Sequence, residues 1–359
     1  MTDGVFDQAR FVSQVAATAR GALDGLSARY PGIAEDAKPF LEPAVGLISG
    51  GKRARARLAH LAWRAAGGES CHPAIVAAGA ALELFQAAAL IHDDVVDDAH
   101  TRRGAPAAHR SFAATHRDGH LVGDDGHYGR SVAILLGDML LALSQLQMVE
   151  AVRMAPAPGE ALEIYGEMCA EVALGQYLDV DAAAHGPGAV DALERAFTVV
   201  RHKSARYSVE RPLVLGATLA DASPELTAAL SAVGEPLGEA FQLRDDELGV
   251  FGKPAVTGKP AGDDLAEGKL TPLILLGCDM ADARDAEFIR DNLGDRTITA
   301  ATVERVRTIL RASGALARHE VLITQRRDLA RRSIDAAPIP AAVRHELTEI
   351  ANNLTSRSF

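Results

Sequence analysis

An apolar run ends in four carboxylates at Leu90-Ile91-His92-Asp93-Asp94-Val95-Val96-Asp97-Asp98. In a helix, Asp93 and Asp97 lie on one face because they are four residues apart, and their negative charges repel each other. The negative end of the helix dipole adds to that cost. Solvation or a bound cation relieves it, and carboxylate oxygens are ligands that Mg²⁺ prefers. The pattern therefore predicts either a solvated acidic helix end or a magnesium site.

Two groups of basic residues favour the magnesium site. One is Thr101-Arg102-Arg103-Gly104, and the other is Gly50-Gly51-Lys52-Arg53-Ala54-Arg55, which opens a predicted helix after a glycine turn. Arginine forks bind diphosphate oxygens, and the free N–H groups at a helix start attract anions. The GxxxxGK[ST] spacing of a P-loop is absent. The alternative for the two arginines is a salt-bridge cluster with the aspartates.

A second acidic helix end follows at Phe241-Gln242-Leu243-Arg244-Asp245-Asp246-Glu247-Leu248-Gly249. A segment rich in Gly, Pro and Lys comes next, with Lys259, Asp263, Asp264 and Lys269. Taken alone, this helix end is most simply a solvated one. Two such ends together with two basic groups instead predict one diphosphate held between them by several Mg²⁺ ions.

The rest of the sequence predicts an all-α protein. Helix formers dominate, and apolar residues recur at steps of three and four, as in Leu82-Phe85-Ala89. A long alternating run of Val, Ile and Thr is absent, so no sheet is expected. Loops are expected near residues 117–129 and 249–269, and residues 1–359 are predicted to form a single domain of roughly ten to fourteen helices.

The composition narrows the class of protein. Of 359 residues, 37 are Lys or Arg and 48 are Asp or Glu, so the formal charge is −11. This balance argues against sequence-independent binding of nucleic acid, and a hydrophobic content of 48% excludes wholesale disorder. Three cysteines without a CxxC pair predict reduced thiols in a cytoplasmic protein. No membrane span is expected, because no run of about 20 residues is both apolar and free of charge.

The combined motifs resemble those of the trans-polyprenyl diphosphate synthases, which have the type I isoprenoid synthase fold around a central cavity. The matching motifs are GGKRxRP at residues 50–56, DDxxD at 93–97 followed by RRG at 102–104, LLGD at 135–138, GQxxD at 175–179, KT(A) at 203–205, FQxxDDxxD at 241–249 and GK at 258–259. The resemblance implies a magnesium-dependent prenyltransferase of short-chain type, acting as a homodimer.

The resemblance also implies a role for each matching residue. Two Mg²⁺ ions would be held on the allylic diphosphate by Asp93, Asp94 and Asp97, and a third by Asp245 with help from Asp246. Contacts to that diphosphate are implied for Arg102, Lys203 and Lys259, and contacts to isopentenyl diphosphate for Lys52, Arg55 and Arg103. The implied substrate-binding set also includes Gly51, Gln86, Ser204, Gln242 and Lys269. The implied catalytic residues are Asp93, Asp94, Asp97, Arg102, Lys203 and Asp245.

Two positions depart from the pattern. Gly249 stands where the family has the third aspartate of its second motif, which removes one carboxylate. Water, Asp263 or Asp264 could take its place. Gln86 stands where many relatives have a histidine, and its amide can still donate to phosphate without adding charge.

The product length is predicted from the helix before Asp93, along which a growing tail would run. Ala88 and Ala89 lie about one turn away and are small, whereas Phe85 lies about two turns away, at roughly 11 Å. Phe85 is therefore expected to act as a floor, which predicts a C20 product, geranylgeranyl diphosphate. Farnesyl diphosphate (C15) is the alternative product, and ordinary core packing is the alternative role of Phe85.

Other functions account for fewer of these residues. A terpene cyclase would need polar ligands where Gly249 and Lys253 stand, and it has no use for residues 52–55. A partner-dependent subunit of a heteromeric synthase would lack the first-motif aspartates, which this chain keeps, but Gly249 leaves this function as an alternative. A di-iron bundle would need two Glu-x-x-His motifs, whereas only Glu69-Ser70-Cys71-His72 is found. The His and Asp residues between 116 and 127 lack zinc-site spacing and are expected to be a solvated loop.

Overall fold

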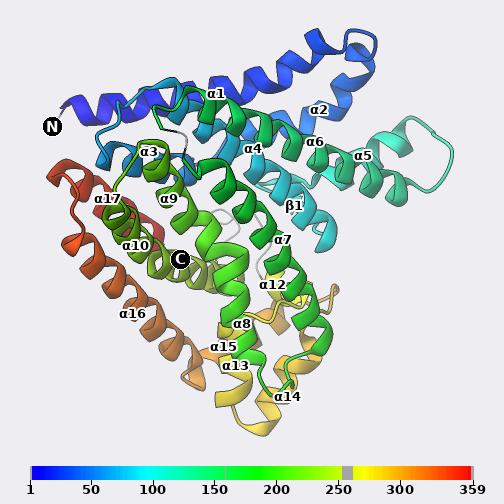
Figure 1. Ribbon diagram of the computed structural model, residues 1–359. Coiled ribbons are helices and arrows are strands. Elements are labelled where there is room, and N and C mark those ends of the chain that lie inside the picture. The colour runs from blue at the N-terminus through cyan, green and yellow to red at the C-terminus, as the bar shows by residue number, and fades with distance from the viewer. Residues whose placement is uncertain (1, 158, 253–261, 357–359) are drawn as a thin grey trace. The chain divides into compact units, whose positions relative to one another are not determined.

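The computed structural model describes residues 2–157, 159–252 and 262–356, with side chains from residue 8 onward. These residues are almost entirely helical (Figure 1), which confirms the all-α prediction. They contain more helices than the ten to fourteen expected, because the C-terminal part is divided into short helices. The chain forms two compact units. Unit 1 comprises residues 1–165 and 212–227, and unit 2 comprises residues 166–211 and 228–359.

Each unit has its own set of helices. Those within unit 1 are α1 (Thr2–Arg29), α2 (Ala34–Ser49), α3 (Ala54–Ala65), α4 (Pro73–Val96), α5 (Ala108–Asp118) and α6 (Asp125–Met154). Three helices contribute residues to both units: α7 (Ala161–His185), α9 (Arg211–Leu219) and α10 (Pro224–Phe251). Those within unit 2 are α8 (Ala192–Val199), the π-helix η1 (Val200–Glu210), α12 (Asp263–Glu267), α13 (Pro272–Met280), α14 (Ala283–Asn292), α15 (Ala300–Ala312), α16 (Ala315–Ala336) and α17 (Ala341–Thr355).

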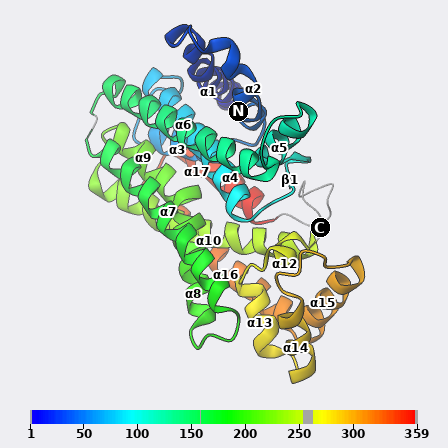
Figure 2. The same cartoon turned by 90° about the vertical axis from the view of Figure 1, so that its right-hand side faces the viewer.

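Helix α4 forms the centre of unit 1. It starts where the ring of His72 accepts the N–H of Ala74 and Pro73 takes the first helical position. It packs against α6, α3 and α1, and Figures 1 and 2 both show α4 and α6 side by side. The core beneath its inner face includes Leu84, Ala88 and Ile91. The acidic motif at the end of α4 is therefore carried by the most firmly packed helix of the unit.

Helices α4 and α6 are long and apolar enough to cross a membrane by length and composition alone, a property that the sequence prediction did not anticipate. In α4, 83% of the apolar window is buried, which is the property of a core helix. In α6 the buried share is only 39%. Helix α6 therefore presents apolar side chains that unit 1 does not cover.

A β-hairpin with strands of two residues each follows α4, and the sequence did not predict it. Its strands are β1 (Thr101–Arg102) and β2 (Ala105–Pro106), paired antiparallel. The loop between them consists of Arg103 and Gly104, whose φ angles of 53° and 78° both lie in the left-handed region. Two such residues form the tight turn that the twist of a hairpin requires. The turn fixes the two neighbouring arginines at the end of the acidic helix.

The two predicted loops are shorter than expected. Helix α5 continues to Asp118 and α6 already begins at Asp125, where the side chain of Asp124 caps it by accepting the N–H of His127 at 2.6 Å. Helix α10 continues to Phe251, and residues 263–267 form α12. Residues 253–261 of the second predicted loop, including Lys259, lie outside the described residues.

Candidate active site

The first acidic helix end holds its aspartates in two different environments. Asp94 is only 1% exposed, whereas Asp93 and Asp97 are half-buried. The Arg102 guanidinium binds both neighbours: its Nε donates to Asp94 Oδ1 at 2.8 Å, and its Nη2 donates to Asp93 Oδ2 at 3.3 Å. The structure therefore joins the predicted metal ligands to a predicted diphosphate ligand within one cluster.

The second basic group lies against Glu83, a carboxylate whose side chain is 11% exposed. Arg53 has φ = 48° at the start of α3, and its Nη1 donates to Glu83 Oε2 at 2.9 Å. Burial raises the pKa of Glu83, although the charges of Arg53, Arg55 and Arg103 oppose that rise. Glu83 thus places one anion beneath three arginines. The predicted isopentenyl diphosphate site is built on this pair.

Gly51 brings the two basic groups of unit 1 together. A Cβ at Gly51, where φ is 97°, would lie 3.3 Å from Arg103 Nη2. The same guanidinium donates to the carbonyl of Leu47 at 2.8 Å. The glycine turn and the hairpin arginine therefore share one surface of unit 1.

The second acidic helix end, in unit 2, holds its three carboxylates in different environments, and Asp245 is the exposed one. Glu247 is fully buried and binds Arg244 at 2.6 Å, so it belongs to the core. Asp246 is 6% exposed, and Gln242 Nε2 donates to its Oδ1 at 2.8 Å. Burial raises the pKa of Asp246 well above its usual range. The charges of Asp264, Asp245 and Asp179 raise it further, against the opposing hydrogen bond from Gln242.

Asp264 occupies the space beside Gly249. A Cβ built at Gly249 would lie 1.7 Å from Asp264 Oδ2 and 2.4 Å from its Cγ. A contact under 3 Å requires one of the two groups to move. The position that lacks the third aspartate of the motif is therefore filled by a carboxylate from α12.

Two lysines of unit 2 that were predicted to bind substrate also form ion pairs with carboxylates. Lys203 Nζ lies 2.6 Å from Asp179 Oδ2, and Lys269 Nζ lies 2.6 Å from Glu267 Oε2. Asp264 Oδ1 is 3.8 Å from the same Lys269 nitrogen. In each unit, acidic side chains therefore form ion pairs with the cationic ones. A diphosphate could bind the same cationic groups beside these carboxylates or in place of them.

The remaining predicted residues occupy the same two units. In unit 1, Lys52 is exposed and Arg55 and Gln86 are half-buried. In unit 2, Ser204 lies within η1, next to Lys203.

The predicted chain-length residues lie on different sides of α4. Phe85 is buried, and its ring meets the Tyr165 ring edge-on at 6.3 Å. Phe85, Ala89 and Asp93 follow each other at steps of four and form one row on the helix. Ala88 is fully buried in the core cluster with Leu84 and Ile91. Ala89 is therefore the small residue in line with Phe85 and the motif, whereas Ala88 packs the core.

Sequence reasoning missed Glu83 and Glu267. Glu83 had a usable signal, because it is the only charged residue in α4 before the acidic motif. A lone carboxylate in an apolar helix needs a partner when it is buried. Glu267 had no comparable signal, since its 2.6 Å pairing with Lys269 depends on how the chain turns after α12.

The carboxylates of the two acidic helix ends suit Mg²⁺ bound partly by water and substrate, rather than a metal enclosed by protein ligands alone. Among the described residues, no three His, Cys, Asp or Glu side chains converge into a group that could hold a metal by themselves. Asp246 is nevertheless buried near three other carboxylates, and no described group donates a hydrogen bond to its Oδ2. Mg²⁺ is commonly bound by one or two carboxylates, waters and substrate phosphates. The carboxylates of both units fit that mode of binding.

An all-α fold with two acidic helix ends, each beside basic side chains, defines an enzyme class that handles diphosphates with magnesium. The polyprenyl synthetase family model matches residues 38–310, so this chain belongs to that family. It is accordingly a prenyltransferase that elongates prenyl chains, and the family is magnesium-dependent.

Individual relatives support the same assignment. The short chain isoprenyl diphosphate synthase of Methanothermobacter thermautotrophicus is 32% identical over 260 residues, which cover 72% of this chain and 73% of the relative. A nonaprenyl diphosphate synthase of Mycobacterium tuberculosis is 31% identical over 265 residues, covering 74% and 71%. A solved geranylgeranyl pyrophosphate synthase from Corynebacterium glutamicum, complexed with isoprenyl diphosphate and magnesium, has a TM-score of 0.90. It is 37% identical, with 97% of this chain and 99% of that chain covered.

Proposed function

We propose that the chain condenses isopentenyl diphosphate with an allylic diphosphate, with geranylgeranyl diphosphate (C20) as its main product. The observation that carries the proposal is the Arg102 cluster, in which one guanidinium binds Asp93 and Asp94 at the end of α4. This cluster presents carboxylates for a metal and a fork for a diphosphate at one point. The single-domain organisation and the cytoplasmic location remain part of the proposal.

The ligands of the allylic diphosphate would come from the two acidic motifs and the basic residues that accompany them. Asp93, Asp94 and Asp97 would hold two Mg²⁺ ions, and Asp245 and Asp246 a third. When bound, the ions neutralise the diphosphate and favour its departure. Arg102, Lys203 and Lys259 would bind the same diphosphate oxygens. Rupture of the allylic C–O bond then transfers both electrons to a leaving group that is already stabilised.

Isopentenyl diphosphate would bind the basic group over Glu83. Lys52, Arg55 and Arg103 would bind its phosphates, with Gly51 allowing close approach and Gln86 donating an amide N–H. The alkene of this substrate attacks the allylic carbon, a proton leaves to the released diphosphate, and the chain becomes five carbons longer. Gln242, Ser204 and Lys269 would complete the lining of the reacting region.

Asp264 would replace the carboxylate missing at Gly249. Its Oδ2 lies where a side chain at 249 would begin, and its charge acts on Asp246. The second acidic end would thereby recover the negative charge that the sequence lacks. Gly249 is then a requirement of this arrangement, because it leaves room for Asp264.

The product length is tested with the wild-type chain and Phe85→Ala. Purified protein is supplied with Mg²⁺, isopentenyl diphosphate and, separately, dimethylallyl, geranyl or farnesyl diphosphate, and the products are identified by mass spectrometry. We expect C20 from the wild type and products longer than C20 from Phe85→Ala, because removing the ring opens the row below Ala89. The nonaprenyl diphosphate synthase among the relatives shows that membership of the family does not determine the length of the product.

Each outcome of this experiment has a defined meaning. Tyr165→Phe is a matched control, since it keeps the ring that meets Phe85 and loses only the hydroxyl, which donates to Ala81 at 3.4 Å. A C15 product from the wild type would refute the length argument but keep the enzyme class. An unchanged product from Phe85→Ala would remove the role of Phe85 as a floor. No condensation with any primer would indicate a partner-dependent subunit.

We further propose that the protein is a homodimer that uses the apolar face of α6. Ile134, Leu135 and Leu146 are 42%, 60% and 48% exposed on this helix. Large apolar side chains gathered on one helix are typical of an interface. Sedimentation equilibrium of the wild type should give twice the 37.8 kDa chain mass, and Leu135→Glu should give the monomer. Gln325→Glu, which adds the same charge at an exposed polar position on α16, should stay dimeric, and a monomeric wild type would contradict the proposal.

A further inference from the structure

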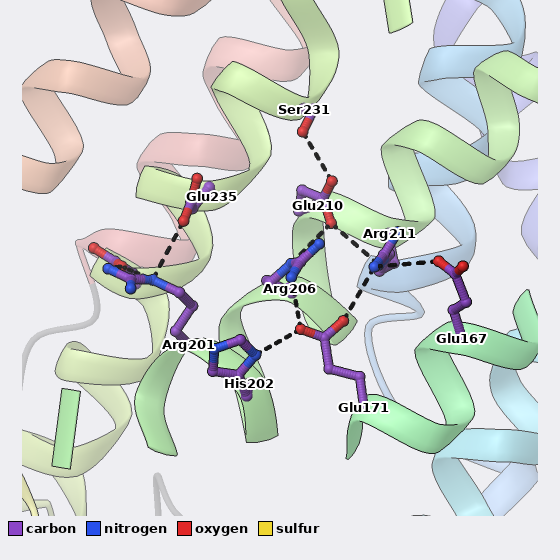
Figure 3. Close-up of polar contacts among 10 residues, drawn as sticks. Glu167, Glu171, Arg201, His202, Arg206, Glu210, Arg211, Ser231 and Glu235 are labelled. Atoms are coloured by element: carbon purple, nitrogen blue, oxygen red, sulfur yellow. Dashed lines mark hydrogen bonds and ion pairs between the residues drawn. The ribbon is translucent and has the colours of Figure 1, made fainter. Parts of the chain in front are cut away.

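Figure 3 shows a cluster of charged side chains in unit 2 that the proposed reaction does not use. Its centre is Glu171 on α7, which is only partly exposed. His202 Nδ1 lies 2.7 Å from Glu171 Oε1, and Arg206 Nη1 donates to the same oxygen at 2.8 Å. Arg211 Nη2 donates to the other oxygen at 3.2 Å. One carboxylate therefore binds three basic side chains that belong to η1 and to the residue after it.

The segment that Glu171 binds has an unusual backbone. Residues 200–210 form a π-helix, and π-helical segments are rare and concentrate at functional sites. Lys203 lies between His202 and Arg206, the two η1 residues that contact Glu171. Changing the π-helix to an ordinary α-helix would rotate Lys203 relative to those neighbours, because the number of residues per turn changes. The direction of Lys203 thus depends on keeping the π-helical form.

Glycines allow η1 to lie directly against the two helices beside it. A Cβ at Gly175 on α7 would lie 2.4 Å from Lys203 N, and a Cβ at Gly238 on α10 would lie 2.3 Å from Ala205 O. These contacts fix the distance of η1 from its neighbours. They do not fix the rotation of η1 about its own axis, since a glycine has no side chain that could make specific contacts. Rotation must be set by side-chain contacts, and those to α7 include the contacts of Glu171 and the Lys203–Asp179 ion pair.

Glu171 and Asp179 hold η1 at two points along α7. They are eight residues apart, a spacing that leaves them on neighbouring faces of the helix about 12 Å apart along its axis. Asp179 binds the Lys203 ammonium at 2.6 Å, while Glu171 binds the residues on either side of Lys203. We propose that Glu171 is a positioning residue, which sets the π-helical form of η1 and so aims Lys203 at the allylic diphosphate.

This inference rests on the proposed role of Lys203, so the experiment tests both separately. Lys203→Ala, Glu171→Gln and the double variant are compared by steady-state kinetics with each substrate varied in turn, and by thermal melting. Glu171→Gln keeps the shape and loses the charge. We expect it to raise the KM for the allylic diphosphate about tenfold, the loss typical of a charged hydrogen bond, with the KM for isopentenyl diphosphate unchanged.

The double variant decides whether Glu171 acts through Lys203. If it does, adding Glu171→Gln to Lys203→Ala should change the allylic KM by less than twofold. Glu167→Gln is the matched control, because Glu167 lies one turn earlier on α7, is mostly exposed and only approaches Arg211 at 3.7 Å. It should leave both KM values unchanged.

The two ideas fail in different ways. An unchanged allylic KM in Lys203→Ala would refute the proposed role of Lys203. A raised allylic KM in Lys203→Ala with a wild-type value in Glu171→Gln would refute the positioning role alone. Equal rises of both KM values together with a lower melting temperature would assign Glu171 to stability only. If Glu171→Gln does not fold, His202→Asn removes one of the same contacts and should raise the allylic KM in the same direction.

Discussion

Asp93→Asn is expected to lower the condensation rate by about 10³-fold in a protein that stays folded, because it removes one carboxylate that would hold the Mg²⁺ ions that stabilise the departing diphosphate. Asp93 is half-buried at the end of the core helix α4, where Arg102 Nη2 reaches it at 3.3 Å. Asparagine keeps the size of the side chain and the helix end. The loss should therefore appear in kcat, measured as prenyl diphosphate formed per second at saturating substrates and Mg²⁺.

Asp98→Asn provides the matched control. It removes the same charge five residues away, from a side chain that is 53% exposed and binds Arg110 at 2.8 Å. Asparagine also tolerates the left-handed φ of 52° found at this position. We expect its kcat to stay within about threefold of the wild type, since exposed ion pairs contribute little. Equal kcat values for Asp93→Asn and the wild type would contradict the assignment of the acidic motif.

Features that depend on local spacing could be predicted from the sequence. The acidic end of α4 follows from an apolar helix and a four-residue step, and both are properties of neighbouring residues. The type I′ geometry at Arg103 and Gly104 is local as well, yet it was missed, because arginine rarely adopts the positive φ that this turn needs. The sequence thus predicted which residues gather at the end of α4 but not the hairpin that holds them.

Contacts between distant segments could not be predicted. Glu83 lies 30 residues from Arg53, and their 2.9 Å contact depends on how α3 packs against α4. The π-helix η1 has no sequence signal, because its extra residue per turn is held by contacts with α7 and α10. The sequence shows that Gly249 takes the place of an aspartate, and Asp264 is one of several groups that could supply the missing carboxylate. Only the packing of α12 against α10 singles out Asp264.

The second large effect is expected at Gly249, where restoring the family's aspartate should impair the enzyme. A Cβ at this position would lie 1.7 Å from Asp264 Oδ2, so Gly249→Asp must displace the carboxylate beside it. Gly249 lies in α10 with an ordinary helical backbone, and the new side chain is strained only by that contact. We expect Gly249→Asp and Asp264→Ala each to weaken Mg²⁺ binding about tenfold, the lower end of the cost for groups that support a metal site.

Combining the changes should reverse the loss. In Gly249→Asp/Asp264→Ala, the new carboxylate gains the space that Asp264 leaves, and Mg²⁺ binding should return to within about threefold of the wild type, whereas additive effects would give about a hundredfold loss. Gly249→Ala/Asp264→Ala relieves the same contact without supplying a carboxylate, so it should remain weak. Binding is read from the rise in melting temperature as Mg²⁺ is added with inorganic pyrophosphate, which requires no turnover. If Gly249→Asp bound Mg²⁺ as tightly as the wild type, the proposal that Asp264 supplies the missing carboxylate would be refuted. The carboxylates of residues 249 and 264 cannot occupy the same space.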